Sequence, residues 1–141
     1  MGPGTGRAVT AAQDILVSYG LIVLLYGFVL GVPLAVARSS APQASRYLVT
    51  AHLSALIQGP VALGCAFAVG AVSFDSTWAT AAACLLVAGL VAETVGGTVN
   101  WLQGTNDQFA ERSLGFRINA LTGALAIPGL AIIVIGVVTR L

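Results

Sequence analysis

The sequence predicts an all-α transmembrane four-helix bundle. Of its 141 residues, 57% are hydrophobic and only 8% are charged, and the apolar residues fall into four long runs. A soluble domain needs more charge to cover its surface, whereas a bilayer core requires about 20 mostly apolar residues per helix. We therefore expect one integral membrane domain over residues 1–141, with its helices in a lipid bilayer.

The four expected helices cover about residues 15–37, 48–74, 77–103 and 118–139. Polar residues and Pro42 end the first helix. The stretch 73–77 is short, so the second and third helices should form an antiparallel hairpin. Residues 103–117 make a polar connection of mixed charge before the last helix.

Arginine placement indicates which end of the bundle faces the cytoplasm. The first and third connections share one side and hold four of the six arginines, and the other side holds two. The four are Arg38, Arg46, Arg112 and Arg117, and the two are Arg7 and Arg140. Positive residues favour the cytoplasmic side, so we expect both termini outside and a multi-pass protein of the bacterial inner membrane. The formal net charge of +1 indicates no nucleic-acid partner.

Small residues recur at helical spacing in the first two helices. Gly27 and Gly31 form a GxxxG pattern, and Ala62, Ala66 and Gly70 repeat it in the second helix. Such faces allow two helices to approach closely. They predict either packing inside the bundle or the seam of a homo-oligomer, and the sequence leaves both open.

The two cysteines, Cys65 and Cys84, both fall within apolar segments, and no CxxC pattern is present. That placement indicates neither a zinc site nor a redox motif. We expect both to be small buried hydrophobic residues.

Function is best sought among polar residues at membrane depth, because each is costly there unless it is partnered or used. The candidates are His52, Gln58, Glu93 and Asn100. A hairpin centred near residue 75 places Gln58 level with Glu93 and His52 level with Asn100. With a rise of about 1.5 Å per residue, the first pair lies about 10 Å deeper than the second.

His52 is the only histidine. It is either an interfacial residue bonded to a carbonyl, or a proton carrier or metal ligand. A single histidine suits haem best among metal groups, because the porphyrin supplies the other ligands. Glu93 is either a structural partner of Gln58 or a general acid or base. Asn100 and Trp101 lie near the helix end, where an aromatic residue can anchor at the interface.

Tyr19 and Tyr26 are seven residues apart and share a face of the first helix. They either pack in the core or present a hydroxyl to a cavity between helices.

The stretch Ala51-His52-Leu-Ser-Ala-Leu-Ile-Gln58-Gly59 resembles a pattern in the styrene oxide isomerases and the hydroxylaminobenzene mutases, two related groups of small four-helix membrane enzymes. Both start the second helix with Ala-His and place Asn-Gly six residues after the histidine. Here Gln58 replaces the asparagine. The segment Gly97-Thr98-Val99-Asn100-Trp101-Leu102 is similar to the third helix of the mutases.

The resemblance implies a homotrimer or other homo-oligomer that binds haem b near subunit interfaces, with His52 as the axial ligand of the iron. Ferric iron would act as a Lewis acid, and Gln58 would orient substrate oxygen in place of the asparagine. The tyrosine of the isomerases' third helix has no match, and Asn100 or Trp101 falls nearest its place. This departure favours the mutase branch over epoxide chemistry.

The sequence thus predicts a haem-dependent membrane isomerase for a small hydrophobic substrate with a weak N–O or C–O bond. His52 would hold the iron, Gln58 and Asn100 would orient substrate, Trp101 would stand near the missing tyrosine, and Glu93 would move a proton. The first alternative is a small multidrug-type transporter with Glu93 as its coupling carboxylate. A structural membrane subunit and a haem redox protein related by fold alone are the others.

Overall fold

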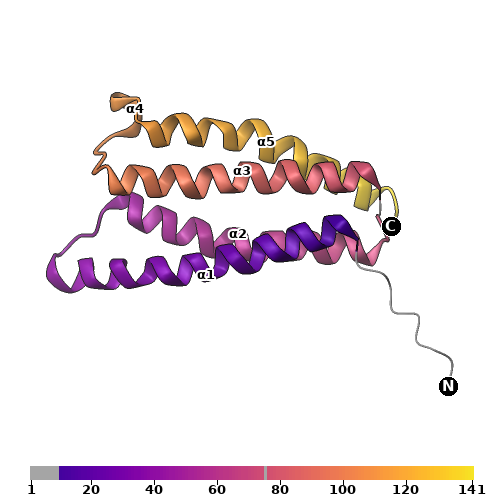
Figure 1. Ribbon diagram of the computed structural model, residues 1–141, viewed down its shortest axis with the longest axis horizontal. Helices are drawn as coiled ribbons and strands as arrows, with labels where there is room; N and C mark the ends of the chain where they lie inside the picture. The colour runs from indigo at the N-terminus through magenta and orange to yellow at the C-terminus, as the bar shows by residue number, and fades with distance from the viewer. Residues whose placement is uncertain (1–9, 75) are drawn as a thin grey trace, which may run out of the picture.

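The computed structural model describes residues 10–74 and 76–141, and the chain forms four long helices and one short one (Figure 1). They are α1 (Ala11–Ser40), α2 (Arg46–Ala71), α3 (Thr77–Leu102), α4 (Gln108–Glu111) and α5 (Leu114–Val138). The four long helices are long and apolar enough to cross a membrane. The predicted all-α four-helix bundle is confirmed, and the chain is a multi-pass membrane protein.

Local capping explains where the helices depart from the predicted bounds. α1 begins at Ala11 because Thr10 and Gln13 form a capping box, in which each side chain bonds the other's backbone N–H. α3 ends in a Schellman motif, with Gly104 at φ 64° and backbone bonds from Gly104 to Trp101 and from Thr105 to Asn100. The short α4 was not predicted.

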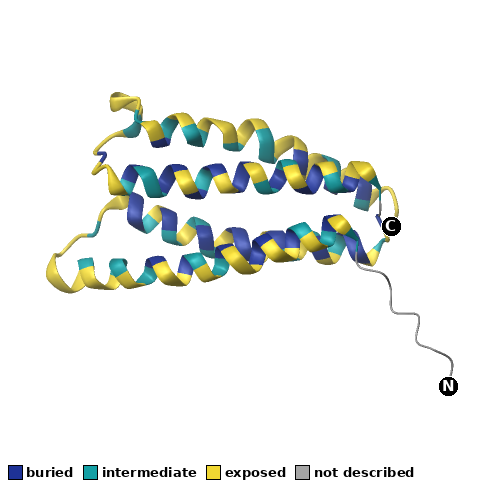
Figure 2. Ribbon diagram, viewed as in Figure 1, coloured by how far each residue is buried: buried dark blue, intermediate teal, exposed yellow. Residues whose placement is uncertain are grey.

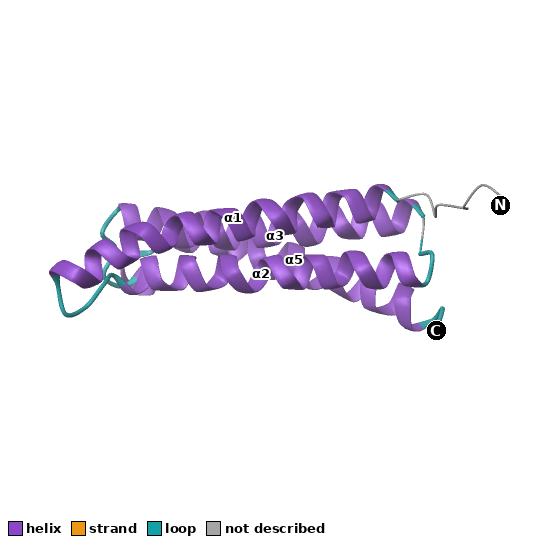
Figure 3. Cartoon of the chain, turned by 90° about the horizontal axis from the view of Figure 1, so that it is seen from below, coloured by secondary structure: helices purple, strands orange, loops and turns teal. Residues whose placement is uncertain are grey.

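The connections alternate between the two ends of the bundle (Figures 1 and 3). The α1–α2 connection and the segment 103–113 share one end, and the α2–α3 turn and the C-terminus share the other. Arg38, Arg46, Arg112 and Arg117 therefore lie toward one end, as predicted, and Arg140 lies at the opposite end. Arg7 lies outside the described residues, and the cytoplasmic assignment stays a prediction.

Glycines bring α3 and α5 into backbone contact. A Cβ added to Gly89 would lie 2.5 Å from the backbone nitrogen of Ala126, and one added to Gly129 would lie 2.5 Å from that of Leu86. Any side chain at these positions would push the helices apart.

The α1–α2 pair is built in the same way. Gly20 and Gly59 face each other, with an added Cβ on each falling 3.1 and 3.0 Å from the other's carbonyl oxygen. Gly27 packs against Ala55 and Leu56. The small residues of α2 that the sequence singled out are also buried; they are Ala62, Ala66 and Gly70. The prediction that these faces pack inside the bundle is therefore confirmed, and the seam of a homo-oligomer stays a prediction.

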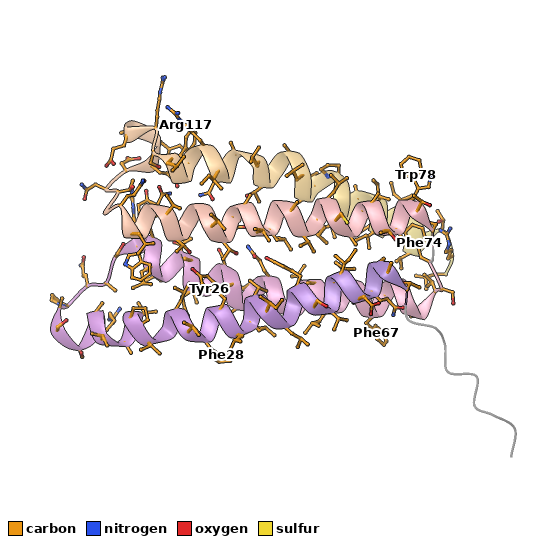
Figure 4. The ribbon with its side chains drawn as sticks, in the orientation of Figure 1. Tyr26, Phe28, Phe67, Phe74, Trp78 and Arg117 are labelled. Carbon is orange, nitrogen blue, oxygen red and sulfur yellow. The ribbon has the colours of Figure 1, made fainter. Side chains whose placement is uncertain are left out.

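The α1–α2 pair and the α3–α5 pair contact each other less closely than the helices within each pair do. α2 and α1 both contact α3, whereas α2 and α5 touch only slightly. α3 is the most buried of the long helices and α5 the least (Figure 2). Large apolar side chains such as Phe28 and Phe67, 68% and 77% exposed, point away from the bundle toward lipid (Figure 4).

Cys65 is half-buried, but Cys84 is exposed, so the prediction that Cys84 is buried was wrong.

We predict that Gly89→Ala destabilises the protein by about 1–3 kcal/mol, because the new methyl group would overlap the backbone of α5. The matched control is Gly64→Ala, since no heavy atom lies within 4 Å of a Cβ there. That variant should be as stable as the wild type or more stable by about 1 kcal/mol. Thermal unfolding in detergent measures both, and equal effects would contradict the proposed seam.

Candidate functional site

A buried hydrogen-bond network crosses the centre of the bundle through Gln58. Its Oε1 accepts hydrogen bonds from Tyr19 Oη at 2.6 Å and Thr94 Oγ1 at 2.8 Å. Its Nε2 donates to Glu93 Oε2 at 3.1 Å, and Ser54 Oγ donates to Glu93 Oε1 at 3.0 Å. The prediction that Gln58 and Glu93 lie at one depth is confirmed.

Helical spacing brings these groups together. Ser54 and Gln58 are four residues apart, so they share a face of α2 and both reach Glu93 on α3. Gln58 is only 5% exposed. Both acceptor positions of its oxygen are filled, and one amide hydrogen remains after the bond to Glu93. The network therefore joins three helices through one amide.

Glu93 faces a cavity of about 620 Å³ between α2 and α5. α3 forms its floor at Glu93 and Gly97, and residues 107–109 lie at its mouth. A second cavity of about 240 Å³ shares Ser54 and Glu93 with the first and continues past the apolar residues Ile57, Val61 and Leu90. The carboxylate thus stands where a polar cavity meets an apolar one.

Two buried polar atoms of α5 have no hydrogen-bond partner among the described residues. They are Asn119 Oδ1 and Thr122 Oγ1, and both residues line the 620 Å³ cavity from α5. Buried polar atoms are nearly always partnered. Asn119 Oδ1 lies against Gly96 inside the contact between α3 and α5, so Thr122 Oγ1 is the one of the two that a change of side-chain rotamer could turn toward a donor in the cavity.

The opposite face of the bundle holds an apolar cavity of about 500 Å³ between α1 and α3, lined by Tyr19, Tyr26, Thr94 and Thr98 among others. Thr98 Oγ1 donates to the carbonyl of Thr94 at 2.8 Å, so Tyr26 must be the donor in its 2.7 Å bond to Thr98. The prediction that the two tyrosines share a face is confirmed, and their hydroxyls serve contacts between helices.

His52 faces α1 rather than the cavity that contains Glu93. Its Nδ1 lies 2.8 Å from the carbonyl oxygen of Gly27, and its ring packs beside Gly31. A carbonyl only accepts, so Nδ1 carries a proton and the neutral ring has its lone pair on Nε2. Among the described residues, no three His, Cys, Asp or Glu side chains are grouped to hold a metal ion.

Asn100 is fully buried and holds the segment after α3 in place. Its Nδ2 donates to Gln108 Oε1 at 2.8 Å, and its Oδ1 accepts from Ser113 Oγ at 2.6 Å. Trp101 packs against the buried cluster of Leu30 and Leu48. The structure therefore separates Asn100 and Trp101 from Gln58 and Glu93, and their predicted roles toward substrate stay predictions.

The mouth of the cavity is held by Arg46 and Tyr47. Arg46 donates to the Tyr47 hydroxyl at 2.9 Å and to the carbonyl of Asn106, and Gln108 N donates to Tyr47 at 2.9 Å. Asp107 caps α4, and the backbone N–H groups of Phe109 and Ala110 hold the pKa of its carboxyl below the usual value. Arg46 and Asp107 are therefore already engaged by the connection.

Sequence reasoning missed Ser54, Thr94, Asn119 and Thr122. Ser54 could have been found, because it lies one helical turn before Gln58 on the same face. Asn119 and Thr122 lie in a strongly apolar helix where no partner is evident from spacing.

The fold and these contacts define a multi-pass membrane bundle with a polar network across its centre. Comparisons with protein-family models, with curated proteins and with solved structures find no match.

We predict that Gln58→Met, which keeps the length of the side chain, destabilises the bundle by about 1–2 kcal/mol, because it leaves three partners on α1 and α3 without their bonds. Tyr26→Phe removes a single bond and should cost about half as much. Thermal unfolding in detergent compares them. Wild-type stability for Gln58→Met would show that the network contributes nothing to the fold.

Proposed function

We propose that the protein is a haem-dependent membrane isomerase that rearranges a small hydrophobic molecule with a weak N–O or C–O bond. The observation that supports this best is the setting of His52. Its Nδ1 is held by the Gly27 carbonyl, which leaves Nε2 as a ligand atom. A hydrogen bond from the other ring nitrogen to a carbonyl is typical of metal-binding histidines, because it sets both tautomer and ring orientation.

The residues around His52 fit haem b. The ring is only partly buried on the α1–α2 pair, and Gly31 beside it adds no side chain that would cover it. A porphyrin requires one axial ligand from the chain, which His52 can offer. When bound, ferric haem would supply a Lewis acid for the weak bond of the substrate.

The chain's own residues would orient the substrate and move its proton. Gln58 keeps one amide hydrogen for a substrate oxygen, and Gln58 and Glu93 both line the cavity of about 240 Å³. An apolar substrate would enter this cavity from the bilayer. His52 and Ser54 point to different sides of α2, so we propose that His52 of one copy works with the cavity of the next in a homotrimer or other homo-oligomer.

A transporter is the second candidate, favoured by one observation. Glu93 borders two cavities that share residues, and the larger one lies between α2 and α5, which contact each other only slightly. A carboxylate in that setting suits coupled exchange of a ligand and a proton. The bacterial inner membrane suits either function.

We predict that the protein purified in detergent from haem-replete cells shows a strong Soret absorption band. His52→Ala should abolish the band, because it removes the only imidazole of the chain. Tyr26→Phe, a conservative change on α1, should retain it. A colourless wild-type protein, or an unchanged spectrum in His52→Ala, would contradict the haem proposal.

Activity measurements on two variants distinguish the isomerase from the transporter. An isomerase should convert an aryl hydroxylamine or an epoxide without net change in the iron's oxidation state, and His52→Ala should be inactive. A transporter should instead lose activity in Glu93→Gln and keep it in His52→Ala.

A further inference from the structure

We propose that the cavity between α2 and α5 binds an apolar molecule with a primary ammonium head group, and that Glu93 holds the head group. This inference rests on the cavity alone. It depends on neither haem nor His52, and it adds a ligand class to the site.

The carboxylate of Glu93 has only neutral partners in the described chain, the Ser54 hydroxyl and the Gln58 amide. Arg46 is the arginine that lines the same cavity, but it bonds Tyr47 and the carbonyl of Asn106. Two turns of α2 separate Arg46 from Ser54, about 12 Å along the helix axis. A cationic ligand would therefore supply the charge partner that the chain does not provide.

An unpartnered oxygen across the cavity favours the same head group. Thr122 Oγ1 has no hydrogen-bond partner among the described residues, and a hydroxyl oxygen can accept. A primary ammonium group has three donor hydrogens and no acceptor. Rotation of the threonine side chain, which has two accessible rotamers in a helix, would turn its oxygen toward the cavity that the residue already lines. One hydrogen can then bond Glu93 while another bonds Thr122 on α5.

The apolar side chains near Glu93 favour a ligand whose body is apolar. The adjoining cavity of about 240 Å³ runs past Ile57, Val61 and Leu90. The larger cavity of about 620 Å³ lies within the range of about 300–1,000 Å³ that small-molecule sites occupy. An aromatic or short aliphatic amine would place its charge at Glu93 and its body among these side chains.

The test compares two probes of the same shape, tritiated 2-phenylethylamine and tritiated 2-phenylethanol. Binding is measured by equilibrium dialysis on the full chain in nanodiscs of phosphatidylcholine, which carries no net charge to attract the amine. The wild type should bind the amine about tenfold more tightly than the alcohol, because a charge-assisted bond is stronger than a neutral one. Glu93→Gln should bring the two affinities to near equality.

Asp14→Asn is the matched control, because it removes an exposed carboxylate of α1 that does not line the cavity. It should keep the preference for the amine. Thr122→Val should weaken amine binding about threefold and raise the unfolding temperature, since it removes an unpartnered oxygen. Equal affinity of the wild type for both probes would overturn the inference, and so would an amine preference that survives Glu93→Gln.

Discussion

The backbone contact between α3 and α5 at Gly89 and Gly129 sets how closely these two helices pack. Lipid is as apolar as the side chains, so helices in a bilayer associate through close packing rather than through exclusion from water. Glycine seams satisfy that requirement within α3–α5 and within α1–α2. The space left between the two pairs is packed less closely, and the cavities beside Glu93 lie there.

The polar network compensates for this looser packing. Gln58 joins α1, α2 and α3 through Tyr19, Thr94 and Glu93. Polar groups at membrane depth are stabilised only when they are partnered, so the same bonds that hold the pairs together also fix the position of Glu93. Its carboxylate is held on one side by Ser54 and Gln58 and is open to the cavity on the other. The cluster of Gln58, Ser54 and Glu93 therefore both links the helices and presents an accessible carboxylate.

The sequence predicts how deep each residue lies in the membrane better than it predicts which way the side chain points. Hydropathy located the four spans, and the short turn near residue 75 placed Gln58 level with Glu93. The direction of each side chain was harder to predict, because lipid-facing and core-facing residues are both apolar and the helical periodicity of hydrophobic residues is weak. Cys84 was accordingly predicted to be buried and faces lipid. His52 and Asn100 were predicted at one depth, but one faces α1 and the other the segment before α5. The short α4 depends on capping by Asp107, which hydropathy does not report.

The two sides of α2 present different chemistry, and this limits what one copy of the chain can do. His52 is directed to α1 by the Gly27 carbonyl, while Ser54, two residues on, bonds Glu93 beside the cavity. Successive helical positions differ by about 100°, so no rotation of α2 brings both side chains to one point. If His52 and Glu93 serve a single reaction, the second group must come from a neighbouring copy. α5, the least buried long helix, leaves a broad apolar surface beside the cavity on which such a copy could pack.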